Sequence, residues 1–385
     1  MSGVVIRAGA AREDTADEVN SEKVEGVEEE QTANMGPKVL VLYIGGTIGM
    51  VADSLGSLKP CPGYLTKELT TMPEMTADDM PNVDVKEYDT LVDSSDMDAS
   101  DWAAIVRDIE DNYFNYDGFV VLQGTDTMAY SASALSFMLE NLGKPVVLTG
   151  SMIPLIKGYS DARRNLLMAI FIAGTSCIPE VCIFFFDKLL RGNRSKKLDT
   201  GSLDAFQSPN FGPLASVGVG IQYHESFHLD PPKKPFRTHK TMDRGVAAIR
   251  MIPGFDDEIL RALKNVSSLK AIVVELYGTG NAPSRKRGLV EALESLIAAG
   301  KLVVVVSQCP TGNVDLLAYA VGRRLAEAGC LSGHDMTVEA VAAKLSYLFG
   351  RGLSPAIVRD RLSVSLRGEL TTSSERRAPR LTSPL

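Results

Sequence analysis

The chain has 385 residues, of which 45% are hydrophobic and 23% are charged, a composition typical of a globular protein with a sizeable buried core. At about 150 residues per domain, this length predicts two domains. The formal net charge of -8 disfavours nucleic acid and anionic membranes as partners, and the sequence has no run of about 18 apolar residues that would predict a membrane span.

Cysteine usage and the N-terminus indicate the compartment. The five cysteines are odd in number and contain no CxxC pair, which disfavours a disulfide framework or a zinc site and favours a reducing environment. The N-terminus has neither the layout of a signal peptide nor the basic character of a transit peptide. We therefore expect a cytoplasmic protein.

The chain opens with an acidic, aperiodic stretch. Residues 1–36 contain the run Glu28-Glu29-Glu30 and are predicted to be a disordered tail. From Lys38 onward, the short apolar run 39–43 ends in Gly45-Gly46-Thr47, a pattern that predicts a buried strand followed by a glycine turn.

The same strand-and-glycine pattern returns further along. The apolar run 118–122 leads into Gly124-Thr125-Asp126-Thr127, with predicted helices before it at 102–113 and after it at 128–142. A strand at 145–148, a helix at 161–173 and a strand at 181–186 follow. Alternation of apolar strands with amphipathic helices predicts an α/β domain, residues 37–225, with a parallel sheet covered on both faces.

The composition changes near residue 223, where prolines and charges predict a linker over residues 226–246. A second α/β series predicts a smaller C-terminal domain, residues 247–370, and residues 371–385 are predicted to be a second disordered tail. The expected elements of this domain are strands at 271–276 and 302–307 and helices at 285–299, 313–328 and 338–349.

The two glycine turns are the first candidates for chemistry. Ligands of open parallel sheets collect outside the carboxyl ends of the strands, and glycines there let backbone N–H groups approach a ligand. Gly45-Gly46-Thr47 and Gly124-Thr125-Asp126-Thr127 both add hydroxyls at such an end. One such turn is more often a plain strand exit, whereas two on separate strands of one sheet strengthen the case for a functional site without excluding two plain strand exits.

Histidine is scarce. All four histidines follow residue 223, so a Ser-His or Cys-His mechanism built locally on the threonine turns is disfavoured. His224 and His228 have the spacing of a metal pair but lack a nearby third ligand, and they are interpreted as surface residues.

A lysine could activate a hydroxyl instead, if it is neutral at the right moment. The candidate lies in the basic stretch 191–197, and Asp126 could hold it in place. Burial lowers the pKa of such a lysine while the carboxylate raises it, and the sequence leaves the balance open. Composition alone favours a basic surface loop for this stretch.

Several motifs together resemble the bacterial-type L-asparaginases, specifically their cytosolic type I branch, over roughly residues 37–370. They are 45–50 (GGTIGM), 93–97 (DSSDM), 124–128 (GTDTM), 130–145, 185–197, 277–283 (YGTGNAP), 308–309 (QC) and 335–340 (DMTVEA). The resemblance implies a two-domain asparaginase-like fold with a Rossmann-like N-terminal domain, a homodimer or homotetramer, and no cofactor or metal.

The resemblance also implies roles for individual residues. Thr47 corresponds to the nucleophile that attacks the side-chain amide carbon of L-asparagine, giving L-aspartate and ammonia. Thr125, Lys197 and Asp126 correspond to a Thr-Lys-Asp relay. Asp93 and Ser94 correspond to residues that hold the α-amino and α-carboxylate groups, and Asp126 also to a contact of the ammonium. Backbone N–H groups near Thr125, in the Gly124 turn, are expected to stabilise the oxyanion.

Four places depart from the type I pattern. Gln123 and Ile44 stand where histidine and threonine are usual, and the stretch 56–60 lacks the tyrosine that orients the nucleophile in many relatives. We expect altered loop closure to affect kcat or KM before chemistry is lost. Glu275 stands where an arginine clamps activating asparagine in some type I enzymes, and a carboxylate cannot clamp a carboxylate; because Cys309 does match the pattern, the sequence leaves cooperative activation open.

Two alternatives to an asparaginase remain at this point. One is the amidase subunit of a tRNA-dependent amidotransferase, which shares the asparaginase core; such subunits usually carry an added folded N-terminal domain. The other is a non-catalytic amino-acid-binding protein on the same fold. Gln123 and the missing tyrosine favour this alternative.

Overall fold

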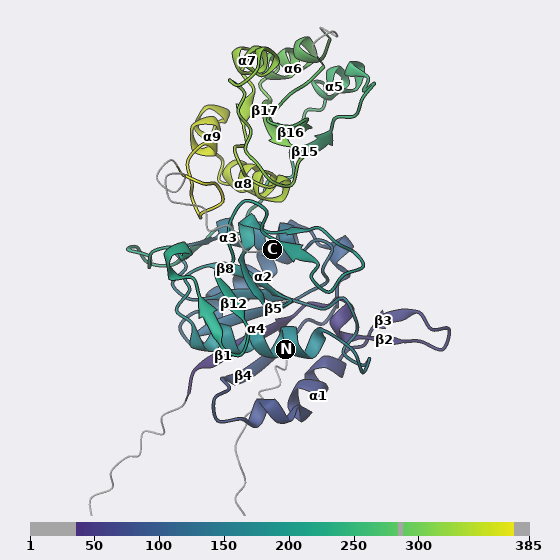
Figure 1. Ribbon diagram of the computed structural model, residues 1–385, viewed down its shortest axis with the longest axis vertical. Helices are drawn as coiled ribbons and strands as arrows, with labels where there is room; N and C mark the ends of the chain where they lie inside the picture. Colours follow the sequence, from purple (N-terminus) through teal and green to yellow (C-terminus); the bar gives the residue numbers. More distant parts are fainter. Residues whose placement is uncertain (1–35, 284–287, 373–385) are drawn as a thin grey trace, which may run out of the picture.

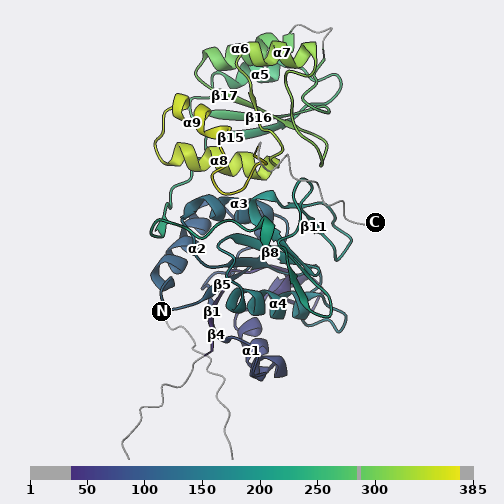
Figure 2. The same ribbon diagram turned by 60° about the vertical axis from the view of Figure 1, so that its left-hand side comes forward.

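The computed structural model describes residues 36–283 and 288–372, which form a larger N-terminal lobe and a smaller C-terminal lobe stacked along the long axis (Figures 1 and 2). The predicted tails 1–36 and 371–385 lie almost wholly outside the described residues, as does the start of the predicted helix 285–299. No helix of the described chain is long and apolar enough to cross a membrane.

The N-terminal lobe is built on an eight-stranded sheet with the order β13-β12-β9-β8-β7-β5-β1-β4. Its parallel strands are β4 (Asn82–Glu87), β1 (Lys38–Tyr43), β5 (Gly118–Leu122), β7 (Val146–Thr149) and β8 (Val181–Phe185). A strand series with antiparallel pairings, β9 (Lys188–Arg191), β12 (Ala215–Val217) and β13 (Ile221–Tyr223), extends the β8 edge. The sequence predicted the parallel part but not this short, irregular extension.

Helices cover both faces of this sheet because successive side chains of the buried strands point to opposite sides. Leu40 and Leu42 of β1 pack with α2 (Ala99–Asn112) and α3 (Met128–Met138). Val39 and Val41 pack on the other face with α1 (Tyr64–Thr71) and α4 (Ala162–Thr175). The near-continuous apolar strands noted in the sequence are therefore explained by burial on two sides.

Two predicted helices are shorter than expected. The helix predicted over 128–142 ends at Met138, because Leu139–Glu140 (β6) leaves it to pair with Arg237–Thr238 (β14). The helix predicted over 313–328 is only α7 (Ala320–Glu327), because the Val314 N–H bonds the carbonyl of His334 and the Asp315 carboxylate accepts the Leu317 N–H. Strand pairing ends the first helix, whereas in the second segment the Leu317 N–H bonds a nearby side chain instead of the carbonyl four residues earlier.

The segment predicted as a linker, residues 226–246, runs along the surface of the N-terminal lobe. Phe236 stacks on Tyr113 with ring centroids 3.7 Å apart, and the Asn141 amide donates to the Pro235 carbonyl. Thr238 and Lys240 both bond the Glu110 carboxylate. This segment is held to the lobe over much of its length.

The C-terminal lobe has a parallel sheet with the order β15-β16-β17-β18, comprising Val246–Arg250, Ala271–Leu276, Leu302–Ser307 and Leu331–Ser332. Its helices are α5 (Asp257–Leu263), α6 (Gly288–Ala298), α7, α8 (Val338–Gly350) and α9 (Pro355–Leu362). Helix α8 packs against α3, so one apolar core runs from the first lobe into the second (Figure 2).

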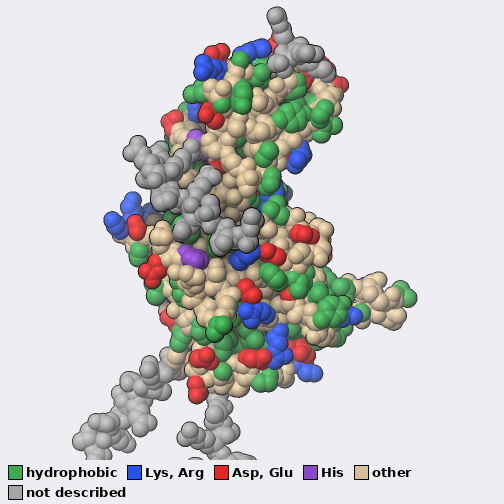
Figure 3. Space-filling view, viewed as in Figure 1, with side chains coloured by type: hydrophobic (Ala, Val, Ile, Leu, Met, Phe, Trp, Pro, Cys, Tyr) green, Lys and Arg blue, Asp and Glu red, His purple; other side chains and the backbone are tan. Residues whose placement is uncertain are grey.

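One element stands away from this body. Strands β2 (Met50–Ala52) and β3 (Leu58–Pro60) form a hairpin that projects from the N-terminal lobe (Figure 1). Figure 3 shows side chains of both charge signs interspersed over the body of the N-terminal lobe from which the hairpin projects. The hairpin directly continues the 3-10 turn at Thr47–Gly49, which follows β1.

Candidate active site

The two threonine turns meet where the strand order reverses. From β1 the chain goes first to β4 on one side and then to β5 on the other, so a crevice opens between the carboxyl ends of β1 and β5. Thr47 follows β1 and Thr125 follows β5. The sheet topology thus brings together two segments that lie 78 positions apart in the chain.

Glycines allow the turns to approach this closely. A Cβ on Gly46, whose φ is +91°, would lie 2.3 Å from the backbone nitrogen of Gly124, and one on Gly124 would lie 2.5 Å from the Ser94 hydroxyl. The Thr127 hydroxyl donates to the Ser94 carbonyl at 2.6 Å. Three loops therefore interlock through their backbones, and neither glycine can take a side chain without moving a neighbouring loop.

A cavity of about 160 Å³ opens at this junction. It contains all the residues that the sequence had selected, namely Thr47, Asp93, Ser94, Gly124, Thr125, Asp126 and Lys197. Gly46, Met50, Ser151 and Met152 complete its lining. Every lining residue belongs to the N-terminal lobe.

Lys197 links the second turn into a relay. Its Nζ lies 2.8 Å from the Thr125 hydroxyl and 2.7 Å from Oδ1 of Asp126. The lysine side chain is 13% exposed and that of Asp126 is 69% exposed, so solvent screens the carboxylate end of the pair. The basic stretch 191–197 is therefore not a plain surface loop, because Lys197 at its end points toward the buried Thr125 hydroxyl.

Asp93 and Ser94 lie on the loop after β4. Oδ1 of Asp93 accepts the backbone N–H and the hydroxyl of Ser95, both at 2.9 Å, which fixes the carboxylate at the cavity. Ser94 is 3% exposed. The carboxylate is suited to an ammonium and the hydroxyl can donate to a carboxylate.

Ser151 and Met152 were missed in the sequence. They follow β7, whose end Thr149-Gly150-Ser151 again places a glycine and hydroxyls at the carboxyl end of a parallel strand, so the signal was present. The Ser151 hydroxyl is buried and has no hydrogen-bond partner. The Asp161 carboxylate holds this loop by accepting the N–H groups of Met152 and Ile153, each at 3.0 Å.

The departures from the type I pattern lie in different places. Gln123 and Ile44 are each 1% exposed and do not line the cavity. The stretch 56–60 forms the end of the projecting hairpin, and Tyr64 starts α1 beyond it. Glu275 lies on β16 and pairs with Arg250 at 3.4 Å.

The histidine pair makes other contacts. His224 Nε2 lies 3.2 Å from the Ser216 hydroxyl, and His228 Nε2 lies 3.0 Å from the Leu214 carbonyl. Across the part of the chain that the structure describes, no group of three or more potential ligands could hold a metal ion.

Family models match both lobes of the chain. The model described as "Asparaginase, N-terminal" matches residues 38–228, and "Glutaminase/Asparaginase C-terminal domain" matches residues 245–362. The chain belongs to the asparaginase family. Its α/β fold of two domains, with a large mixed sheet and a smaller parallel one, is the fold expected from the resemblance.

Individual relatives agree with this assignment. The chain is 44% identical to L-asparaginase 1 of Escherichia coli K12, over 86% of this chain and 98% of that protein. A protein named 60 kDa lysophospholipase from Homo sapiens is 40% identical over 90% of this chain and 64% of its own length. The crystal structure of L-asparaginase I from Vibrio cholerae matches with a TM-score of 0.81 and 42% identity, covering 88% of this chain and all of the other.

Proposed function

We propose that this asparaginase-family chain is an L-asparaginase, which hydrolyses the side-chain amide of L-asparagine to L-aspartate and ammonia. The observation that carries the proposal is the Lys197 amine, bonded to both Thr125 and Asp126 in the cavity that also holds Thr47. The 44% identity to L-asparaginase 1 of E. coli supports it.

In the proposed reaction, the Thr47 hydroxyl attacks the amide carbon. Its proton passes to the leaving nitrogen, the C–N bond breaks, and ammonia departs from an ester on Thr47. Water then attacks the ester carbonyl, releasing L-aspartate and restoring the hydroxyl. Each step develops negative charge on the carbonyl oxygen, which backbone N–H groups of the Gly124 turn are proposed to stabilise; one such donor contributes about 3–4 kcal/mol.

The relay supplies proton transfer. Lys197 lies within hydrogen-bond reach of the Thr125 hydroxyl, so in its neutral form it can take that proton and leave a stronger base in the cavity. Asp126 holds the amine from the other side. Asp93 and Ser94 are proposed to bind the α-ammonium and α-carboxylate of the substrate, with Asp126 as a further contact of the ammonium.

Substrate size follows from the cavity. Its 160 Å³ lies below the roughly 300–1,000 Å³ of drug-sized ligand sites, which suits a small polar amino acid better than the acyl chain of a lysophospholipid. Glutamine carries one methylene more, and a pocket rejects a methylene by about 1–3 kcal/mol, or roughly 10–200-fold. We expect kcat/KM to favour asparagine; equal values for the two amides would contradict this.

The decisive experiment is ammonia release from asparagine by the purified chain. Wild type is expected to turn over, whereas Thr47→Ala and Thr125→Val lose activity by about 1,000-fold or more, because they remove the nucleophile and the partner of Lys197. Thr76→Val is a matched control, since Thr76 is exposed in a turn outside the cavity. Binding of asparagine without turnover in wild type would favour an amino-acid-binding protein.

The setting of the reaction is part of the proposal. The enzyme is proposed to act in the cytoplasm as a homodimer or homotetramer, without metal or cofactor. Retention of tRNA in a filter assay would instead favour the amidase subunit of a tRNA-dependent amidotransferase.

A further inference from the structure

The catalytic lysine lies at the end of a tightly folded segment. The lysine turn, defined here as Arg191–Lys197, runs from the end of β9 through a 3-10 turn at Gly192–Arg194 to β10, Lys196–Lys197. Ser195 is fully buried, and its hydroxyl donates to the Arg191 carbonyl at 2.7 Å. A shift of this turn therefore moves the lysine backbone directly.

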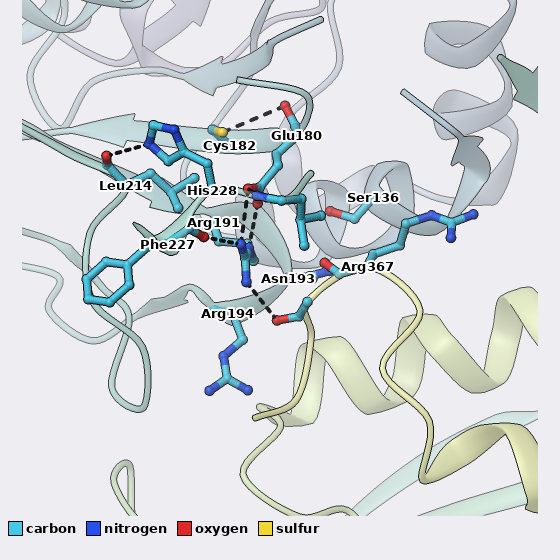
Figure 4. A network of polar contacts seen from close by, with 12 residues as sticks. Ser136, Glu180, Cys182, Arg191, Asn193, Arg194, Leu214, Phe227, His228 and Arg367 are labelled. Atoms are coloured by element: carbon cyan, nitrogen blue, oxygen red, sulfur yellow. Dashed lines mark hydrogen bonds and ion pairs between the residues drawn. The ribbon is translucent and has the colours of Figure 1, made fainter. Parts of the chain in front are cut away.

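The C-terminal lobe makes several hydrogen bonds to this turn, although it contributes no described residue to the cavity lining. The contacting segment, defined here as the C-terminal strap, is residues 367–371. The Asn193 amide donates to the Arg367 carbonyl at 2.9 Å, and Arg191 donates to the Gly368 carbonyl at 3.3 Å. Figure 4 shows Arg191 held between Glu180 and the Phe227 carbonyl, with Asn193 beside Arg367.

Arg194 is the centre of the contact. Its guanidinium donates to the Glu369 carbonyl at 2.7 Å, to the Thr371 hydroxyl at 2.9 Å and to Oδ2 of Asp335 at 2.8 Å. The Arg194 side chain is 1% exposed and that of Asp335 is 10% exposed, so this is a buried ion pair between the lobes.

Asp335 stands on a rigid support. It lies just before α8, which packs against α3, the helix that follows Thr125 and Asp126. Asp335 also accepts the Thr371 backbone N–H at 3.0 Å. The strap is tied to α8 by a fully buried ion pair between Lys344 and Glu369 at 2.6 Å. Helix α8 is therefore linked indirectly to both partners of the Lys197–Thr125 hydrogen bond. It packs against α3, which follows Thr125, and Asp335, just before α8, pairs with Arg194 in the lysine turn.

We propose that Arg194 and Asp335 are positioning residues that align the Lys197 amine with the Thr125 hydroxyl, so that the C-terminal lobe of the same chain influences the catalytic rate through contacts outside the cavity. The inference rests on the proposed function. A buried ion pair is frequently no more stabilising than apolar residues of the same volume, so its clearest use here is geometric. Misplacement of a catalytic group by 1 Å can cost about 100-fold in rate.

The test compares Asp335→Asn and Arg194→Ala with wild type. We expect kcat for asparagine to fall by about 10–100-fold with KM changed less than about threefold, because Asp93 and Ser94 lie on a loop that the ion pair does not contact. The double variant is expected to be no slower than the slower single variant, since both changes break one interaction. Guanidinium chloride at non-denaturing concentrations should partly restore kcat of Arg194→Ala, with saturation.

The matched control is Arg351→Ala. Arg351 and Glu140 form another ion pair between the lobes, at 2.8 Å, but neither belongs to the lysine turn or the strap. Its kcat is expected to stay near wild type. If Asp335→Asn fails to fold by near-ultraviolet circular dichroism, Thr371→Val provides a milder disturbance of the same contact and is expected to lower kcat with KM retained.

Two results would overturn the inference. One is an unchanged kcat in folded Asp335→Asn or, where that variant fails to fold, in Thr371→Val. The other is a kcat loss in Arg351→Ala equal to that in Asp335→Asn, which would indicate general loosening of the lobes. Either can occur in an active wild type that depends on Thr47, so the positioning role can fail while the proposed function stands.

Discussion

The polar side chains that line the cavity differ in whether they have a hydrogen-bond partner within the protein. Thr125, Asp126 and Lys197 bond one another, whereas the buried Ser151 hydroxyl bonds nothing. A buried polar group without a partner costs about 1–3 kcal/mol. Ser151 is therefore a candidate hydrogen-bond partner for a substrate in the cavity.

We predict that Ser151→Ala raises the free energy of unfolding by about 1 kcal/mol and lowers kcat/KM for asparagine by roughly tenfold, because one lost substrate hydrogen bond is worth about 1.4 kcal/mol. Denaturant titration and initial rates measure the two effects. Ser133→Ala is the matched control: Ser133 is also buried with an unpartnered hydroxyl, but in α3 away from the cavity, so it should gain stability and keep its activity. An unchanged kcat/KM in Ser151→Ala would show that Ser151 makes no important hydrogen bond to the substrate.

Much of the site could be predicted at this scale, for a physical reason. Thr47 and Thr125 follow apolar strands, and the parallel alternation alone brings the ends of such strands together. The lysine could be selected only through the resemblance, because a basic stretch after a strand looks like a surface loop. The partnership of Arg194 with Asp335, 141 positions apart, leaves no local signal in the chain.

Among the elements, the β2–β3 hairpin is the one most open to change. Leu55 is 89% exposed, and the turn is held mainly by Asp53, which accepts the N–H groups of Leu55 and Ser57 and pairs with Lys59 at 2.8 Å. The hairpin starts at Met50, a cavity residue three positions after Thr47. The hairpin and the proposed nucleophile are thus joined by only a few residues of chain.

We predict that Ser57→Tyr raises kcat/KM for asparagine by roughly fivefold, about 1 kcal/mol, if the aromatic hydroxyl that the resemblance implies for this stretch orients the nucleophile. Steady-state kinetics measure the gain. Leu55→Tyr places the same side chain nearer the hairpin tip and should leave the rate unchanged. Equal rates in Ser57→Tyr and wild type would show that the missing tyrosine is not limiting.

The contact between the lysine turn and the start of α8 makes the stability of the fold depend on pH. Burial opposes ionisation of Asp335, but the hydrogen bond and charge of Arg194, together with hydrogen bonds from Thr371, outweigh it and lower the pKa to about 2. Because this lies below the ordinary value of 3.8, the carboxylate stabilises the fold fully above about pH 4, and the contribution is lost as pH falls through 2.

We predict that wild type loses about 2 kcal/mol of unfolding free energy from this group between about pH 4 and pH 2, whereas Asp335→Asn starts less stable and loses correspondingly less. Denaturant titrations at several pH values measure both slopes. Parallel pH profiles for the two proteins would refute this assignment of the acid response.

Element boundaries could be predicted only where the helical or strand pattern was uninterrupted. Strands β16 and β17 and helix α8 start and end as their apolar patterns indicate. The end of α3 could not be predicted, because pairing of Leu139–Glu140 with a segment about 100 positions later decides it. The β9-β12-β13 extension consists of strands too short to carry a periodicity.

On the scale of the whole molecule, two series of alternating elements sufficed to predict two α/β lobes, but not how closely they join. The apolar faces of α3 and α8 are separately compatible with burial inside their own lobes, and only the folded chain shows that they bury one another. The joint core makes the lobes a mechanically connected pair, through which a remote lobe can influence the cavity.

Regulation by substrate is also a property of the whole molecule. Glu275 lies on β16 where the resemblance implies an arginine, and it pairs with Arg250 at 3.4 Å. We predict a hyperbolic dependence of rate on asparagine with a Hill coefficient of about 1, because a ligand carboxylate is repelled there. Glu275→Gln should keep the same curve, and a sigmoidal wild-type titration would contradict the prediction.

The close approach at Gly46 and Gly124 also decides which walls of the cavity can be redesigned. Those two positions admit no Cβ without displacing backbone or Ser94, so they are fixed points for any directed change of substrate range. Met50 lines the same space with its side chain and is not a member of the Thr125–Lys197–Asp126 relay, whereas Met152 Sδ accepts the Thr125 hydroxyl at 3.8 Å and Ser151 is the predicted substrate contact. A library that aims to admit longer amides should therefore randomise Met50 first.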